Sequence, residues 1–456
     1  MGEEKGIVRK SWSDRISVAL VYPNSYHVGM SNLGFQTVYD QLNRIDHVIC
    51  ERAFLQKENQ ARRQEIRTLE SNRVLTDFDV VAFSISFEND FPNILSVLDL
   101  AKIPRASESR NAEYHPLIMA GGVACFLNPE PIAPFCDVFL LGESECLLKP
   151  FFDRFSPEND RYGNLLHISN EIEGVYVPSF YSVRYHPDGT LSEFEPAEEV
   201  PKKVRRVFLN DLTRCSTCSS ILTPNTAFEN SFLIEVSRGC PHGCRFCSAG
   251  FVYRPPRFKP LSLLIKDFES GARRSKHIGL MGAAVSDLPC ITELCSLADE
   301  NDVRVSFSSL RADALGAEFI DFLKKSDVKT ATIAPDAGSE RMRKVINKNI
   351  TQDDILTATE ALVSQGILNL KLYFMVGLPT ETVPDIESIV VLCKKIKHLF
   401  LKASRGRGRI GEITVSLNSF VPKAATPFQW APMDSVNSLK KKIRTVKEGL
   451  RRVANI

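Results

Sequence analysis

Residues 231–250 read SFLIEVSRGCPHGCRFCSAG, and this stretch decides how the rest of the chain is organised. The apolar, β-branched run at 232–236 predicts a buried strand. It leads into a loop that is punctuated by glycine and proline and carries Cys240, Cys244 and Cys247 in C-x3-C-x2-C spacing. Three thiolates on one short loop suit a soft metal centre, because each can reach iron without the loop folding back. The sequence therefore predicts an iron–sulfur cluster at the end of this strand.

A structural zinc site and a disulfide are the two alternative roles for the three cysteines. In a structural zinc site His242 would supply the fourth ligand of a tetrahedral set. A disulfide would imply a secreted protein, whereas the polar N-terminus has no apolar core of signal-peptide length. Twelve cysteines spread over 456 residues indicate reduced thiols and a cytoplasmic protein. We therefore favour the cluster.

The cysteine spacing, with Phe246 just before the last cysteine, resembles the C-x3-C-x-aromatic-C signature of the radical S-adenosylmethionine (SAM) superfamily. The resemblance implies that Cys240, Cys244 and Cys247 hold a 4Fe-4S cluster whose open iron chelates SAM. One electron then cleaves SAM to methionine and a 5′-deoxyadenosyl radical. The chain most resembles the branch that carries a cobalamin-binding domain, and this likeness covers nearly the whole chain.

Length and composition indicate a globular protein of two to three domains, with 43% hydrophobic and 25% charged residues. The net charge of +2 gives no global nucleic-acid footprint, and no segment approaches the apolar length of a membrane span. We predict a Rossmann-like, cobalamin-binding-type domain at 1–165 and a connector with a small β-element at 166–225. A radical SAM core at 226–430 and a basic C-terminal helix at 431–456 follow.

In the N-terminal third, strands predicted at 16–22, 80–87, 117–120 and 138–141 alternate with helical stretches such as 33–42 and 93–100. This alternation predicts a parallel sheet that is covered on both faces and binds ligands at the carboxyl ends of its strands. The order resembles the cobalamin-binding domain of the branch, including residues 120–131 and 140–145. The D-x-H-x-x-G motif, whose histidine coordinates cobalt in many cobalamin proteins, is absent from NSYHVG at 24–29.

That departure leaves two interpretations of the N-terminal domain open. It binds cobalamin without a protein ligand to cobalt, or it keeps the shape and contacts another ligand or the substrate. His27 is expected to be a turn or packing residue. Cys215 and Cys218, in C-S-T-C, are expected to be two ordinary reduced thiols; an auxiliary cluster or a redox pair is the alternative.

The C-terminal part contains six strand–helix units with similar spacing. Strands are predicted at 232–236, 278–281, 303–307, 330–334, 370–375 and 413–417, with helices between them such as 354–364 and 385–399. Repeated units of this kind predict a partial (β/α)6 TIM-like barrel with its chemistry at the carboxyl ends of the strands. Six units resemble the open barrel of the superfamily.

Beyond the cysteines, the resemblance implies cofactor contacts at successive strand ends. These residues are Phe246, Gly282, Ala283, Ser308, Arg311, Asp336, Ser339 and Gly377.

The methionyl end of SAM is expected near the second and third strands. The backbone at Gly282 and Ala283 stands where the superfamily often has G-G-E and binds the methionyl amine, although the glutamate is missing here. Ser308 is a candidate partner of the nucleoside, and Arg311 is a candidate partner of the methionyl carboxylate.

The nucleoside end of SAM is expected near the fourth and fifth strands. Asp336 and Ser339 lie in A-P-D-A-G-S-E, which resembles the ribose-binding A-P-E-A-G-S-E motif with aspartate for the first glutamate. Gly377 opens a G-L-P-T-E turn that packs near adenine in the family, where Phe246 is the usual contact with the adenine edge. Turn and helix-cap chemistry is the alternative for these residues, Ser339 included.

The sequence thus predicts a radical SAM enzyme that abstracts hydrogen from an unknown small-molecule or peptide substrate, with cobalamin-dependent methylation as the first choice of reaction. A rearrangement, a methylthiotransferase-like modification and a non-catalytic iron–sulfur scaffold or sensor are the alternatives. An electron donor such as flavodoxin or ferredoxin is the implied partner. Nucleic acid is not expected, and the basic loop at 402–409 is predicted to be solvated.

Overall fold

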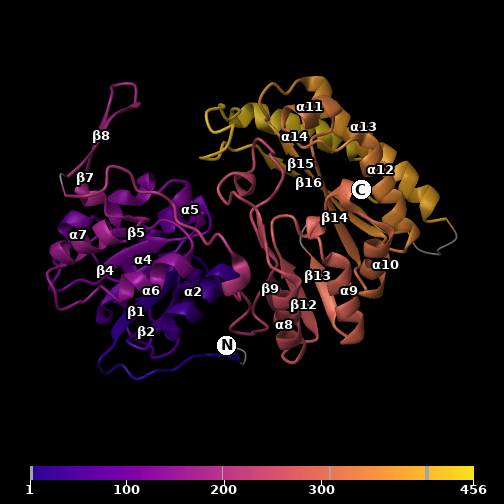
Figure 1. The fold of residues 1–456 in the computed structure, drawn as a ribbon. Helices are drawn as coiled ribbons and strands as arrows, with labels where there is room; N and C mark the ends of the chain where they lie inside the picture. The colour runs from indigo at the N-terminus through magenta and orange to yellow at the C-terminus, as the bar shows by residue number, and fades with distance from the viewer. Residues whose placement is uncertain (1–3, 198, 308–309, 406–409) are drawn as a thin grey trace. The chain divides into compact units, whose positions relative to one another are not determined.

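The computed structural model describes residues 4–197, 199–307, 310–405 and 410–456, and the chain divides into two units (Figure 1). The N-terminal unit comprises Met1–Asp211 and Thr217–Asn230. The C-terminal unit comprises Leu212–Ser216 and Ser231–Ile456. Ser308, predicted to contact the nucleoside, lies outside the described residues.

A six-stranded sheet in the order β2-β1-β3-β4-β5-β6 organises the N-terminal unit. Its strands are β1 (Ile16–Tyr22), β2 (Val48–Phe54), β3 (Val80–Ser84), β4 (Leu117–Gly121), β5 (Val138–Leu140) and β6 (Val175–Tyr176). The first five are parallel, which confirms the predicted parallel sheet, and β6 adds an antiparallel edge strand that was not predicted. The order 2-1-3-4-5 places the topological switch point between β1 and β3, where such sheets bind ligands beyond the carboxyl ends of the strands.

Helices flank this sheet, and the longer ones are α2 (Leu33–Arg44), α4 (Phe91–Leu100), α6 (Ser144–Phe152) and α7 (Arg161–Glu171). The strands are buried along nearly their whole length and consist mainly of apolar residues, as expected of a sheet covered on both faces. α2 and α4 confirm the helices predicted at 33–42 and 93–100.

Strand β2 was missed because its sequence, VICERAF, places two charged residues in a fully buried strand. Arg52 is 1% exposed and pairs with Glu4 at 2.8 Å and with Glu70 at 2.7 Å. The carboxylate of Glu51 accepts hydrogen bonds from the Thr68 hydroxyl (2.6 Å) and from neighbouring groups. These partners come from distant parts of the chain, so the local pattern could not reveal that the charges are buried.

A small antiparallel hairpin, β7 (Tyr181–Tyr185) and β8 (Leu191–Pro196), confirms the β-element predicted in the connector. The amide of His186 donates to the carbonyl of Thr190 (2.8 Å), and Gly189 takes a φ of +81° in the turn. The Asp-Gly pair therefore forms the turn that its chemistry predicts.

The C-terminal unit contains two three-stranded parallel sheets, β13-β12-β9 and β14-β15-β16. Their strands are β9 (Phe232–Glu235), β12 (His277–Met281), β13 (Arg304–Phe307), β14 (Thr330–Asp336), β15 (Asn369–Val376) and β16 (Ile413–Ser419). A parallel bridge between Leu310 and Ile333 links the two sheets, and the Leu310 amide donates to the Thr332 carbonyl at 2.9 Å. All six predicted strands are confirmed. Within the described residues no ladder joins β16 to β9, so hydrogen bonds do not close a barrel.

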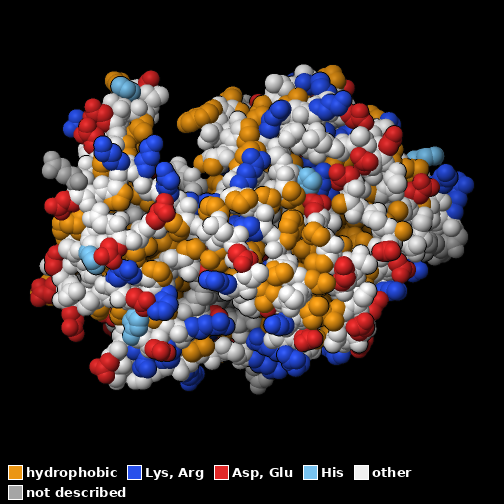
Figure 2. Space-filling model, viewed as in Figure 1, with side chains coloured by type: hydrophobic (Ala, Val, Ile, Leu, Met, Phe, Trp, Pro, Cys, Tyr) orange, Lys and Arg blue, Asp and Glu red, His pale blue; other side chains and the backbone are white. Residues whose placement is uncertain are grey.

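Helices separate these strands: α8 (Leu261–Ala272), α9 (Ile291–Glu300), α10 (Ala317–Lys325), α11 (Glu340–Val345), α12 (Gln352–Ser364) and α13 (Val383–Ala403). The helix α14 (Val436–Leu450) confirms the predicted C-terminal helix and packs on α13. Basic and acidic side chains are interspersed over the face drawn in Figure 2, in keeping with the small net charge. In the described part of the chain, no helix combines the length and apolar character needed to cross a bilayer.

Candidate cluster and SAM site

The cysteine loop begins where β10 (Ser237–Arg238) pairs with β11 (Arg257–Phe258) as an antiparallel ladder. Gly239 has a φ of +81°, and a Cβ there would lie 2.7 Å from the Tyr253 carbonyl oxygen. Within the loop the Cys247 amide donates to the Cys244 carbonyl (3.1 Å). The ladder and these close contacts shape the loop before any ligand is considered.

A second segment, the residues after α11, fixes the middle of the cysteine loop. The Arg245 amide donates to the Ile346 carbonyl (2.9 Å), and the Asn347 side-chain amide donates to the Gly243 carbonyl (2.8 Å). Both contacts flank Cys244, which is buried. The segment lies about a hundred residues further along the chain, so the sequence pattern gave no sign of this support.

The three cysteines are free thiols in the structure. Burial raises the pKa of Cys240, and it raises the pKa of Cys244 to about 11. His242, the ligand that a zinc site would need, instead bonds to Asp287 at 2.5 Å. Across the described residues, no group of three or more His, Cys, Asp or Glu side chains is spaced to hold a single metal ion.

This donor set fits a 4Fe-4S cluster better than a single ion. A cluster binds each thiolate at a different iron atom and so requires wider spacing between sulfur atoms than one ion does. Three soft thiolates without a fourth protein ligand leave one iron of a four-iron cluster open.

Gly282 lies at the base of the cysteine loop, at the end of β12. A Cβ at this position would come within 2.6 Å of the Ser237 hydroxyl oxygen, so a side chain here would force that hydroxyl to move. Ser237 is 4% exposed, and its hydroxyl has no hydrogen-bond partner within the described residues. Ala283 follows as an exposed residue. The backbone predicted to bind the methionyl amine therefore adjoins the start of the loop.

Arg311 follows the end of the third core strand and already has a carboxylate partner. Its guanidinium makes a bidentate ion pair with Asp313, with nitrogen–oxygen distances of 3.0 and 2.7 Å. Burial lowers the pKa of Arg311, but the pair with Asp313 outweighs this effect and the net shift is upward. A methionyl carboxylate would have to share the guanidinium with Asp313.

Asp336 ends β14 just after a register shift that begins at Ile333. It has a φ of +62° and pairs with the Lys348 ammonium at 2.7 Å. Burial raises the pKa of Asp336 although Lys348 and Arg311 oppose the rise. Lys348 is a residue that the sequence reasoning missed.

Ser339 is engaged as a helix cap. Its hydroxyl oxygen accepts from the Met342 amide (3.1 Å) at the start of α11, and the hydroxyl donates to Asp385 Oδ1 (2.6 Å). In this structure the hydroxyl of Ser339 therefore bonds as a helix cap, the alternative to a ribose contact. The T-V-P-D run at the start of α13 is a capping-box pattern, so it could have identified Asp385 as a helix residue but not its bond to Ser339.

Gly377 has a φ of +83° in the turn after β15, and its amide donates to Glu381 Oε2 (2.7 Å). Glu381 pairs in turn with Lys442 of α14 (2.8 Å). Burial raises the pKa of Glu381, against the lowering effect of Lys442.

Phe246 packs against a small apolar cluster at the same strand ends, formed by Ala337, Met342, Ile346, Leu378 and Phe420. The structure thus brings the cysteine loop to the ends of β14, β15 and β16. Cys215, from the predicted thiol pair, is buried, and Arg238 donates to its sulfur (3.2 Å).

In the N-terminal unit, two glycines at the switch-point edge serve close backbone packing. A Cβ at Gly122 would lie 2.4 Å from the Ile85 carbonyl oxygen, and one at Gly142 would lie 2.2 Å from the Val207 carbonyl oxygen. Both residues have positive φ angles that favour glycine. Their presence at strand ends is therefore explained by the domain itself.

The loop after β1 is held by polar contacts with the turn that precedes α4. Buried Asp90 accepts hydrogen bonds from Asn24 (2.8 Å) and Asn93 (3.2 Å). His27 is exposed on the short helix α1 (Tyr26–Met30).

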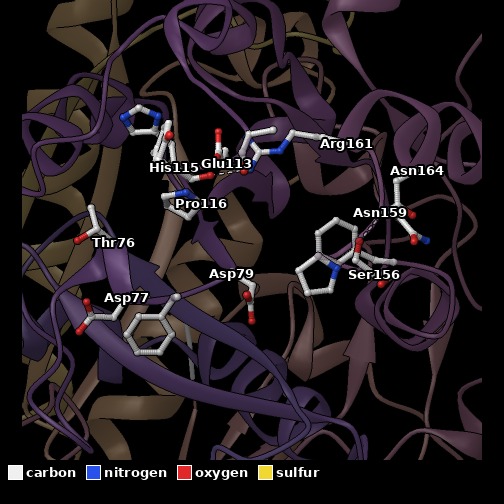
Figure 3. Close-up of a pocket in the computed structure, with 15 residues that line it drawn as sticks. Thr76, Asp77, Asp79, Glu113, His115, Pro116, Ser156, Asn159, Arg161 and Asn164 are labelled. Atoms are coloured by element: carbon white, nitrogen blue, oxygen red, sulfur yellow. Dashed lines mark hydrogen bonds between the residues drawn. The ribbon is translucent and has the colours of Figure 1, made fainter.

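A polar pocket of about 260 Å³ lies at the opposite, amino ends of β3 and β4 (Figure 3). Asp79 and His115 are among the residues that line it, together with Arg161 at the start of α7. The volume is below the range of about 300–1,000 Å³ that is typical of small-molecule sites. Because it lies away from the switch point, it is not part of the predicted cofactor site.

Comparison with known families gives two matches along the chain. The family described as radical SAM proteins, N-terminal, matches residues 34–178, and the radical SAM superfamily matches residues 234–393. The chain belongs to the radical SAM superfamily. It is a radical SAM enzyme, and the cofactors of this family are a 4Fe-4S cluster and SAM.

Two curated relatives show how far the likeness extends. An uncharacterized protein of Methanocaldococcus jannaschii is 33% identical over 445 residues, which cover 96% of this chain and 84% of the relative. Hopanoid C-3 methylase of Methylococcus capsulatus is 29% identical over 252 residues, 54% of this chain and 41% of the methylase. This chain therefore matches less than half of the methylase.

Two solved structures share the fold. The methyltransferase TsrM from Kitasatospora setae, with cobalamin and a [4Fe-4S] cluster bound, gives a TM-score of 0.57 at 15% identity, over 91% of this chain and 77% of TsrM. The cobalamin-dependent enzyme OxsB, with aqua-cobalamin and SAM bound, gives 0.54 at 16% identity, over 96% of this chain and 61% of OxsB. At these identities the likeness shows a common fold of parallel α/β sheets.

Proposed function

We propose that this enzyme cleaves SAM reductively at a 4Fe-4S cluster held by Cys240, Cys244 and Cys247, and that the resulting radical abstracts hydrogen from a substrate for cobalamin-dependent methylation. The observation that carries the proposal is the loop itself. It presents three free thiols, is fixed on both sides of Cys244 by hydrogen bonds, and lies at the ends of parallel strands. The names of the methylase relative and of the methyltransferase TsrM favour methyl transfer, and cobalamin is bound in both TsrM and OxsB.

When bound, the cluster would supply the electron that splits SAM into methionine and a 5′-deoxyadenosyl radical. The chain's own residues would bind and orient SAM. The backbone at Gly282 would take the methionyl amine, Phe246 and the turn at Gly377 would contact adenine, and Arg311 would share its guanidinium between Asp313 and the methionyl carboxylate. The apolar cluster beside Phe246 would help to exclude water from the reacting groups.

The six strand–helix units are proposed to form the open (β/α)6 barrel of the family, in the strand order β9-β12-β13-β14-β15-β16. The bridge between Leu310 and Ile333 supports this order. Residues 1–165 are proposed as the corrinoid-binding domain, 166–225 as connector, 226–430 as core and 431–456 as C-terminal helix. A low-potential donor such as flavodoxin or ferredoxin is the proposed reductant.

A second candidate is a radical SAM enzyme whose N-terminal unit contacts the substrate or another ligand instead of cobalamin. The specific observation behind it is the loop after β1, which lacks the D-x-H-x-x-G motif and leaves His27 exposed on α1.

Anaerobic reconstitution with iron, sulfide and hydroxocobalamin tests both candidates. We expect about four iron atoms per chain, retained corrinoid, and 5′-deoxyadenosine on reduction with SAM present. Single Cys240→Ala, Cys244→Ala and Cys247→Ala variants should lose the cluster, whereas the matched Cys290→Ala variant, which alters a half-buried thiol elsewhere in the unit, should keep it. Cleavage without corrinoid would select the second candidate, and a wild-type protein without iron would overturn both.

A further inference from the structure

The ion pair between Asp336 and Lys348 is a buried feature of the site that the ribose contact predicted for Asp336 does not explain. Its two atoms, Asp336 Oδ2 and Lys348 Nζ, are 2.7 Å apart, and the side chains are 12% and 11% exposed. Desolvating two charges costs several kcal/mol per ion, so a buried pair is weak grounds for a purely stabilising role.

The backbone of β14 is shaped to present Asp336. The ladder with β15 shifts register between Ile333 and Asp336, and Pro335 in this stretch has no amide to donate. Asp336 itself takes the left-handed φ of +62°, which aspartate tolerates better than longer side chains do. This conformation gives a physical reason for aspartate where the family motif has glutamate.

Lys348 is locked to the cysteine loop through its own segment. Ile346 and Asn347, the two preceding residues, bond to the loop on either side of Cys244. The Lys348 amide donates to the Arg343 carbonyl (2.8 Å), and its carbonyl accepts from Arg311 Nη2 (3.4 Å). The backbone of Lys348 is therefore fixed beside the loop, and its ammonium is held by Asp336.

The charges of the pair act on the loop with opposite signs. A cation beside the loop stabilises added negative charge there, and a carboxylate destabilises it. Lys348 directly follows Ile346 and Asn347, the residues that bond to the loop on either side of Cys244, so its charge belongs to the segment that contacts the loop.

We propose that the Asp336–Lys348 pair sets the reduction potential of the cluster, with Lys348 favouring the reduced form and Asp336 both holding Lys348 and limiting its effect. This inference rests on the proposed cluster at Cys240, Cys244 and Cys247. A four-iron cluster with three thiolates is anionic and gains one more negative charge on reduction, so a nearby fixed cation stabilises the reduced state. The effect is strong here because the pair is shielded from solvent.

Potentiometric titration of the reconstituted enzyme, followed by electron paramagnetic resonance, tests the sign of each charge. Lys348→Met should make the potential more negative and Asp336→Asn should make it more positive. We expect about a tenfold change in the ratio of reduced to oxidised cluster at a fixed applied potential, which is about 59 mV for a one-electron couple. Lys348→Arg keeps the charge and should stay near wild type.

Lys344→Met is the matched control, because it removes an exposed lysine four residues earlier and should leave the potential unchanged. Iron content and circular dichroism are measured for each variant, and Asp336→Asn keeps the charge test available if Lys348→Met does not fold. The inference would be overturned if the potential shifts in the same direction in Lys348→Met and Asp336→Asn, or if it shifts in neither. It would also be overturned if Lys348→Arg shifts the potential as far as is expected for Lys348→Met. A wild type without cluster would instead overturn the proposed function.

Discussion

Asp385 joins two helices of the C-terminal unit, and its replacement by asparagine gives a quantitative test of the fold around the site. Its Oδ1 accepts from the Ser339 hydroxyl (2.6 Å) and from Arg341 Nε (3.3 Å). Its Oδ2 accepts from the Thr382 amide (2.9 Å) and hydroxyl (2.6 Å) and pairs with Arg341 Nη2. The side chain is 7% exposed, so water cannot replace these partners freely.

Asparagine has only one acceptor oxygen. In Asp385→Asn the amide nitrogen therefore faces hydrogen-bond donors that a carboxylate oxygen faces in the wild type. At least two charge-assisted hydrogen bonds are then lost, each worth about 1.5–3 kcal/mol. The Arg341 side chain is 49% exposed, and its ion pair therefore adds little. We expect a loss of about 3 kcal/mol in the free energy of unfolding, or roughly 6–12 °C in the melting temperature of a unit of this size.

Differential scanning calorimetry of wild type and Asp385→Asn measures this loss in the transition of the C-terminal unit. Burial raises the pKa of Asp385, but the bonds from Arg341, Ser339 and Thr382 outweigh it and hold the pKa well below its usual range. A carboxylate whose pKa is lowered by folding stabilises the folded state above its unfolded pKa of about 3.9, and this stabilisation is lost as the pH falls towards its folded pKa. The difference in unfolding free energy between wild type and Asp385→Asn should therefore narrow below about pH 4.

The control is Asp321→Asn, which removes one half-exposed carboxylate paired with a lysine on α10 and should cost no more than about 0.5 kcal/mol. If Asp385→Asn costs no more than this control at pH 7, or if its cost is unchanged at acid pH, the account of the helix junction is wrong.

Three further changes test other parts of the molecule. Arg52→Met leaves two buried carboxylates without their cation and should cost about 3–5 kcal/mol in the N-terminal unit, measured by urea denaturation. Lys442→Met removes the cation beside Glu381, and burial already raises the pKa of Glu381. Because a protonated Glu381 side chain needs no cation, the decrease in melting temperature should be larger at pH 8 than at pH 5. His27→Ala should leave corrinoid retention by the reconstituted enzyme unchanged, because His27 is exposed and lies outside any D-x-H-x-x-G motif.

The parallel strands could be predicted because each is a short apolar run bounded by turn residues. Strand β9 begins at the predicted residue, and β15 differs from its prediction by one residue at each end. Strand β2 could not be predicted, since Arg52 is paired with a carboxylate and Glu51 is hydrogen-bonded by hydroxyl groups that only the folded chain brings near. Strand β6 spans two residues, too short for any pattern.

The cysteine loop could be predicted from the sequence because its three cysteines lie close together in the chain. The ligating power of the cysteine loop depends on residues within eight positions of one another, so spacing alone indicates a metal centre. The support of that loop is long-range: Asn347 reaches Gly243 across 104 positions, and Lys442 reaches Glu381 across 61. A single sequence carries no signal for contacts of this kind.

Residues in the recognised motifs also differ in whether packing or charge explains why they are there. Gly122 and Gly142 stand where a ligand-binding interpretation would place them, yet a side chain at either would collide with a neighbouring backbone carbonyl. Their presence therefore follows from packing and does not discriminate between cobalamin and another ligand. Asp336 is the opposite case: its aspartate departs from the family motif, and the left-handed backbone and the ion pair with Lys348 explain the departure. Within one motif-rich chain, then, a matching residue can say little about chemistry, while a mismatched one points to the ion pair that we propose acts on the cluster.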